Sequence, residues 1–92
     1  MADWKLITQY AENAKRQMIL DQTGGEKEFE SLFDSFGPDG MLFFKRAEAY
    51  EACADTISAL ADFRKAKALF PMDVWKEKAQ AGIDRNLKKY VR

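Results

Sequence analysis

The chain has 92 residues, of which 47% are hydrophobic and 33% are charged, and its fifteen basic and fifteen acidic residues cancel. This composition predicts one folded domain over residues 1–92 and excludes a disordered chain, while zero net charge argues against general attraction to nucleic acid or anionic lipid. Histidine is absent, which removes imidazole metal ligands and histidine-based catalysis. We therefore expect no enzyme activity, no catalytic residues, no cofactor and no metal site.

The cellular location is predicted from three further features. The apolar runs are too short to span a bilayer, and the N-terminus lacks the basic start and apolar centre of a signal peptide. The single cysteine, Cys53, excludes an internal disulfide. Because disulfides are rare in the cytosol, we expect a cytoplasmic protein without a membrane partner.

A first helix is predicted from Trp4 to Leu20, with Asp3 as its N-cap. Apolar residues three or four apart form one stripe along it, which Leu6 and Tyr10 widen. A wide apolar arc on a terminal helix favours a two-fold dimer, with a compact monomer as the alternative. The stripe consists of Trp4, Ile7, Ala11, Ala14 and Met18.

"DQTGG", residues 21–25, predicts a break, and its "TGG" is typical of a hairpin turn. Thr23 and Glu26 have the spacing of a capping box, so a second helix is expected behind Thr23. "GPDG", residues 37–40, then gives the clearest stop in the chain. The apolar face of the second helix would consist of Phe29, Leu32, Phe33 and Phe36.

Three more helices are predicted. Two lie behind Asp39 and Asp55, each a candidate N-cap, and Asp73 opens the last; Pro71 ends the second of the three. The connections are short, so neighbouring helices should lie antiparallel. The fold class predicted is an all-α stack of about five antiparallel helices in hairpins. The apolar faces would be Leu42, Phe43, Ala47 and Tyr50; Ala59, Phe63, Ala66 and Phe70; and Trp75, Ala79, Ile83, Leu87 and Tyr90.

Residues 40–73 resemble a tetratricopeptide repeat, a helical hairpin with a period of 34 residues. The positions that carry the resemblance are Phe43, Ala47, Tyr50, Ala59, Phe63, Ala66 and Pro71. Arg46 stands where the family usually has leucine, and Ala54 where a turn glycine is common. Phe29 precedes Phe63 by the same 34 residues. The resemblance therefore implies a degenerate hairpin over 3–36 and a closing helix over 74–91.

The resemblance implies a non-catalytic protein–protein interaction module. In the family, the first helix of each hairpin lines a concave groove that receives a peptide or helix of a partner. Small side chains at Ala47 and Ala59 would let the two helices of the hairpin approach closely. The implied groove residues are Lys5, Gln9, Glu12, Met41, Phe44, Lys45, Glu48, Ala52, Lys78 and Arg85.

Other functions stay open at this stage. A structural helical domain could use its apolar surface only for dimerisation or assembly, and a small regulator could bind nucleic acid, although the net charge speaks against it. Cys53 is expected to be a packed residue rather than a redox thiol. The basic "KKYVR" end is expected to complement the dipole of the last helix.

Overall fold

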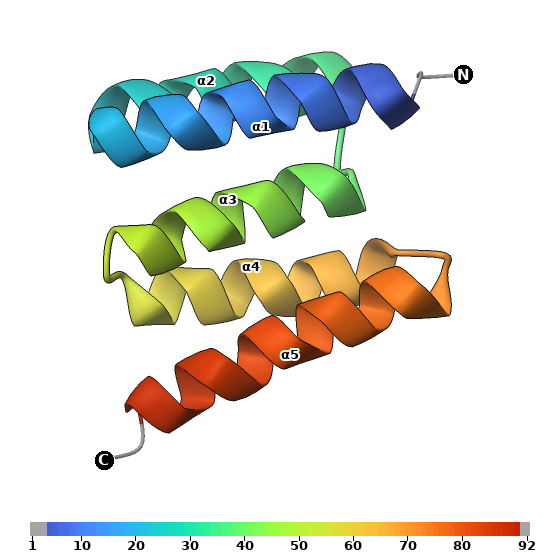
Figure 1. Ribbon diagram of the computed structural model, residues 1–92. Helices are drawn as coiled ribbons and strands as arrows, with labels where there is room; N and C mark the ends of the chain where they lie inside the picture. The colour runs from blue at the N-terminus through green and yellow to red at the C-terminus, as the bar shows by residue number, and fades with distance from the viewer. Residues whose placement is uncertain (1–3, 91–92) are drawn as a thin grey trace.

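The computed structural model describes residues 4–90, which form five α-helices and contain no strand. The helices follow one another as a stack, from the α1/α2 hairpin through α3 and α4 to α5, so that α1 and α5 lie toward opposite ends (Figure 1). The predicted all-α fold of about five helices is confirmed. The helices are α1 (Trp4–Leu20), α2 (Gln22–Phe36), α3 (Gly40–Ala52), α4 (Thr56–Leu69) and α5 (Asp73–Tyr90).

The turn between α1 and α2 is shorter than the sequence predicts. Only Asp21 separates the helices, and Gly24 and Gly25 lie inside α2, so the expected "TGG" turn and the capping box at Thr23 are wrong. The reason is close packing. A Cβ on Gly25 would stand 2.1 Å from the Cα of Met18. Glycine is required there because the two helices touch backbone to backbone.

The predicted caps of α3 and α4 are confirmed. Asp39 accepts a hydrogen bond from the backbone N–H of Met41 at 2.9 Å, and Asp55 accepts one from Ser58 at 3.1 Å. Between these helices Ala54 adopts a φ of 63°. That is the left-handed region, in which a Cβ is unfavourable and glycine is preferred.

The helix α4 ends before Pro71, and α5 begins at Asp73, both as predicted. Tyr90 was expected on the apolar face of the last helix, but it is 62% exposed. It lies at the end of the described chain, where it lines an open groove between α4 and α5. Asp3, the expected cap of α1, and residue 91 of the expected closing helix fall outside the described residues.

Packing orders the stack. Helix α3 packs between α1 and α4 and makes few contacts with α2. Helix α5 packs on α4 and makes few contacts with α3. The molecule is thin, with extents of 41 × 32 × 16 Å. Among residues 4–90, none of the helices is both long and apolar enough to cross a lipid bilayer. The largest fully buried apolar side chains are Ile7, Met18, Phe29, Met41, Leu42 and Phe63.

The core around Phe63 contains the positions that carry the sequence resemblance. Ala47, Ala59, Phe63 and Ala66 are all completely buried, whereas Pro71 is exposed and only ends the helix. On the other side of Phe63, a Cβ at Gly82 would stand 2.6 Å from the Phe63 ring. The missing side chain at Gly82 therefore lets α5 lie directly on α4. Phe43 and Tyr50 are half-buried at the edge of this core.

Candidate protein-binding groove

Helices α1, α3 and α5 succeed one another on one face of the stack, the face turned toward the viewer in Figure 1. Between α3 and α5 this face is hollowed into an open groove of about 310 Å³. We call it the α3/α5 groove. It is lined by Phe44, Lys45, Glu48, Trp75, Lys78, Ala81 and Arg85.

The structure brings half of the ten residues predicted to bind a partner into the α3/α5 groove: Phe44, Lys45, Glu48, Lys78 and Arg85. Three others, Lys5, Gln9 and Ala52, are exposed outside it, and Glu12 is half-buried next to Lys45.

Met41 does not reach the surface. Its side chain is 1% exposed, so it belongs to the core and offers nothing to a partner. It lies near the start of α3, where Trp4 and Phe70 line the same small cavity. Helix spacing alone could not show that side chains from three helices converge over this position.

An ion-pair network joins α1 to α3 beside the groove. Lys45 Nζ lies 2.9 Å from Glu12 Oε2 and 3.5 Å from Glu48 Oε1, and Lys15 Nζ lies 3.4 Å from the same Glu48 oxygen. The hydrogen bond from Lys45 lowers the pKa of Glu12, outweighing burial, which acts in the opposite direction. Burial alone would lower the pKa of Lys45, but the hydrogen bond and charge of Glu12 raise it. Both groups stay ionised at neutral pH.

A second network ties the end of α3 to α5. Arg85 donates two hydrogen bonds to the carboxylate of Glu51, at 3.0 and 3.1 Å, and Asn86 Nδ2 donates a third at 2.9 Å. Burial would raise the pKa of Glu51, but the hydrogen bonds and charge of Arg85 outweigh it and lower the pKa. Asn86 is completely buried, and its Oδ1 has no hydrogen-bond partner among the described residues. The pairing with Glu51 fixes Arg85 at the rim of the groove.

Aromatic rings line the other half of the groove. The Phe44 and Trp75 rings meet edge to face at 5.8 Å, and Trp75 meets Trp4 in the same way at 5.9 Å. The Lys78 ammonium lies 5.2 Å from the centre of the Trp75 ring, within reach of a cation–π interaction. Trp4 and Trp75 come from the first and last helices, so the ring contact closes this end of the face. Apolar spacing had placed Trp75 on the packed side of its helix, and its role at the groove was missed.

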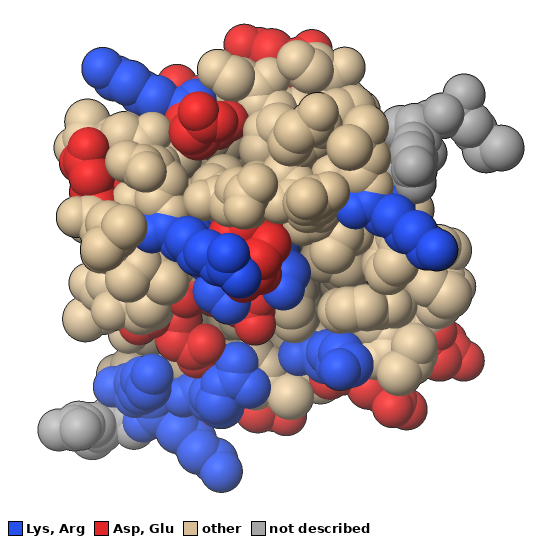
Figure 2. Space-filling model, turned by 45° about the horizontal axis from the view of Figure 1, so that its top comes forward, with Lys and Arg blue, Asp and Glu red and all other residues tan. Residues whose placement is uncertain are grey.

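Basic side chains dominate the charged part of this face. Figure 2 shows Lys and Arg side chains over the middle and lower parts of the view, around a smaller acidic cluster, while the upper part, over the α1/α2 hairpin, is mostly uncharged. In the two networks, four cations form ion pairs with three carboxylates. The cations are Lys15, Lys45, Arg85 and Lys89, and the carboxylates are those of Glu12, Glu48 and Glu51. Lys78 adds a further positive charge at the groove rim.

The chemistry that the groove offers is binding. It presents the half-buried Trp75 ring beside Phe44, which is only 7% exposed, together with ammonium and guanidinium groups and carboxylates that are already engaged in ion pairs. Within residues 4–90, no group of acidic and thiol side chains is arranged to hold a metal ion. No protein family, characterised protein or solved structure shows significant similarity to this chain.

Proposed function

We propose that the protein is a non-catalytic interaction module that binds a segment of a partner protein in the α3/α5 groove. The observation that carries the proposal is the juxtaposition of Trp75 and Phe44 with Lys78 and Arg85 around one open groove. Aromatic and arginine side chains are enriched among the residues that dominate binding energy at protein interfaces. A groove of this kind suits an extended or helical peptide, whose apolar side chain packs on the rings.

The partner segment should be acidic. The cations of the face exceed its anions, and Lys78 projects from the exposed surface of α5. Acidic side chains flanking an apolar anchor would meet Lys78 and Arg85 at the rim, where charge chiefly affects association rate and specificity. This local excess of positive charge is not apparent from the net charge of the whole chain, which is zero. Because the net charge is zero, nucleic acid is a less favoured partner than an acidic protein segment.

Kinship with tetratricopeptide repeats is part of the proposal. Its support is the complete burial of Ala47, Ala59, Phe63 and Ala66 at the spacing of the repeat. Gly25 stands 34 residues before Ala59, one repeat period, and likewise lies where two helices touch. A small residue is thus present at the helix contact of each hairpin. A cytoplasmic location remains a prediction.

Selection from a displayed peptide library tests the proposal. The wild-type protein should enrich peptides with an apolar anchor and flanking Asp or Glu. A Lys78→Glu variant should lose those peptides, because it reverses the charge at the groove rim. The matched control is Lys27→Glu on the exposed surface of α2, which should enrich the same peptides as wild type. Loss of enrichment in both variants, or no acidic enrichment by wild type, would contradict the proposal.

A further inference from the structure

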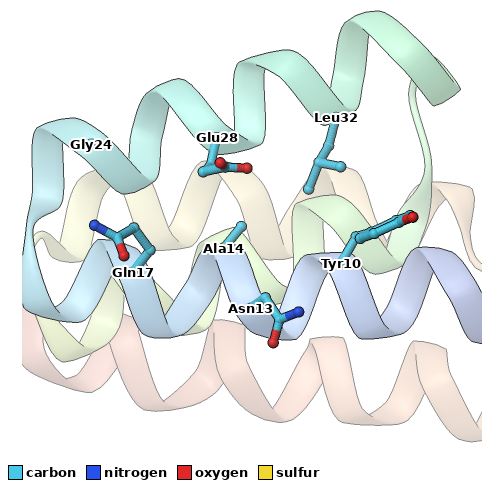
Figure 3. Close-up of a pocket in the computed structure, with 7 residues that line it drawn as sticks. All are labelled: Tyr10, Asn13, Ala14, Gln17, Gly24, Glu28 and Leu32. Atoms are coloured by element: carbon cyan, nitrogen blue, oxygen red, sulfur yellow. The ribbon is translucent and has the colours of Figure 1, made fainter.

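The outer surface of the α1/α2 hairpin carries an open groove that has no part in the α3/α5 site. It has a volume of about 400 Å³ and lies between the two helices at one end of the stack. Figure 3 shows Glu28 and Leu32 projecting from α2 toward α1, above Ala14 and Tyr10. We call this surface the α1/α2 end face. It is lined by Tyr10, Asn13, Ala14, Gln17, Gly24, Glu28 and Leu32.

The opposite end of the stack carries a second such groove, of about 320 Å³, between α4 and α5. Its apolar lining is strongly exposed, since Ile57 is 67% and Tyr90 62% accessible. We call this surface the α4/α5 end face. It is lined by Ile57, Leu60, Ala61, Arg64, Leu87 and Tyr90.

Both end faces are surfaces that the repeating arrangement would normally cover. Within the stack, α3 covers one flank of α1, and α5 covers one flank of α4. No helix of residues 4–90 covers the outer flank of the α1/α2 hairpin or of the α4/α5 pair. Stacked helical units bury a continuous core only when each meets a neighbour, so terminal faces of this kind usually become polar caps. Here they keep Tyr10, Leu32, Ile57 and Leu87.

Helix α2 at one end of the stack and helices α4 and α5 at the other carry opposite charge. Helix α2 has four acidic residues and one basic residue. Helix α4 has three basic residues and one acidic residue, and α5 has five basic and three acidic residues. Helix α1 has three basic residues and one acidic residue, so the acidic character of the first end lies on α2. At the grooves themselves, Glu28 of α2 lies on one end face and Arg64 of α4 on the other.

We propose that the occupant of each end face is the other end face of a second copy of this chain. The α1/α2 end face of one molecule packs on the α4/α5 end face of the next, with the apolar side chains of the two grooves in contact and Glu28 near Arg64. Such a head-to-tail contact uses two different surfaces, so it propagates into open chains. Opposite charges favour this pairing, whereas the two-fold dimer expected from the sequence would bring together two copies of α1, each with three basic residues and one acidic residue.

Two surface-disrupted variants test the head-to-tail arrangement. The head-blocked variant carries Asn13→Arg and Glu28→Arg, which reverse the charge of the α1/α2 end face. The tail-blocked variant carries Ile57→Arg and Ala61→Arg, which remove apolar contact from the α4/α5 end face and fill its groove. All four positions are exposed, and circular dichroism would verify that both variants keep the helical fold.

Sedimentation velocity from micromolar to millimolar concentration gives the readout. Wild-type protein should grow progressively beyond a dimer, less so at high salt, because screening weakens charge pairing. Each variant alone should stay monomeric, and an equimolar mixture should form a one-to-one dimer through the two intact faces. A wild-type mass fixed at 10.6 kDa would overturn the proposal. So would a mixture that stays monomeric, or a tail-blocked variant that dimerises alone through a symmetric α1/α2 contact.

Discussion

Arg46 and Asp62 form a two-point ion pair that joins α3 to α4. Nε of Arg46 lies 2.6 Å from Oδ2 of Asp62, and Nη2 lies 3.0 Å from Oδ1. Asp62 is only 5% exposed, and the guanidinium also lies 4.8 Å from the centre of the Phe33 ring on α2. A position at which the repeat family usually has leucine therefore holds a charged side chain that connects three helices. The charge at this position is balanced by Asp62.

Breaking this pair should destabilise the fold strongly. Arg46→Leu leaves a buried carboxylate without its partner, so we expect the free energy of unfolding to fall by about 3–5 kcal/mol. In the double variant Arg46→Leu/Asp62→Leu no charge stays buried, and most of the loss should be recovered. Urea denaturation of both variants measures the difference. Losses that simply add would show that the two side chains are not coupled.

The two neighbouring glycines of α2 should respond in opposite ways to alanine. Gly25→Ala places a Cβ 2.1 Å from the Cα of Met18, and we expect a loss of at least about 3 kcal/mol, the top of the usual range for overpacking. Gly24→Ala meets only the exposed, movable carboxylate of Asp21. Its helix propensity should leave stability unchanged or raise it by up to about 1 kcal/mol. Thermal melts decide the matter, and equal melting temperatures would refute the close α1–α2 contact.

Ala54→Gly should stabilise the protein. Ala54 has a φ of 63°, a conformation that costs a residue with a Cβ about 1–2 kcal/mol. Glycine removes that cost but makes the unfolded chain more flexible, which lowers the free energy of unfolding by about 0.4–1 kcal/mol. The expected net gain is about 0–1.6 kcal/mol, the difference of those two effects. Urea denaturation gives the value, and a loss of stability would mean that the turn is not left-handed at this residue.

Stability should fall in acid because of Glu12 and Glu51. The folded pKa of each lies below the ordinary value of 4.5, so their stabilisation is complete above that pH and is lost as the pH falls through the folded pKa values. Glu51→Gln should flatten the decline of stability below pH 4.5, the ordinary pKa. Chemical denaturation of the wild type and the variant at a series of pH values provides both slopes, and equal slopes would contradict the role of Glu51.

The sequence predicts the helices well because caps and breakers act locally. Asp39, Asp55 and Pro71 set boundaries through their own backbone geometry, and each acts as expected. The prediction for Gly25 was wrong because its role depends on Met18 of the adjacent helix. In the sequence, a glycine that forms a turn cannot be distinguished from a glycine at a helix contact. Apart from its spacing of 34 residues to Ala59, nothing in the sequence marks this contact.

The groove was only partly predictable for the same reason. Lys45, Glu48, Lys78 and Arg85 were expected in a groove because of the resemblance to a tetratricopeptide repeat. The contribution of Trp75 depends on how α5 lies against α3 and on the ring contact with Trp4. The side-chain spacing of α5 alone did not contain that information.

The central claim is that the α3/α5 groove binds an acidic segment of a partner. The most direct measurement is a two-dimensional amide NMR titration of the dilute protein with the peptide enriched from the displayed library. We predict chemical-shift changes concentrated on Phe44, Glu48, Trp75, Lys78 and Arg85, with saturation, and their loss in Lys78→Glu. Changes centred instead on either end face of the stack, or no saturable change, would contradict the account.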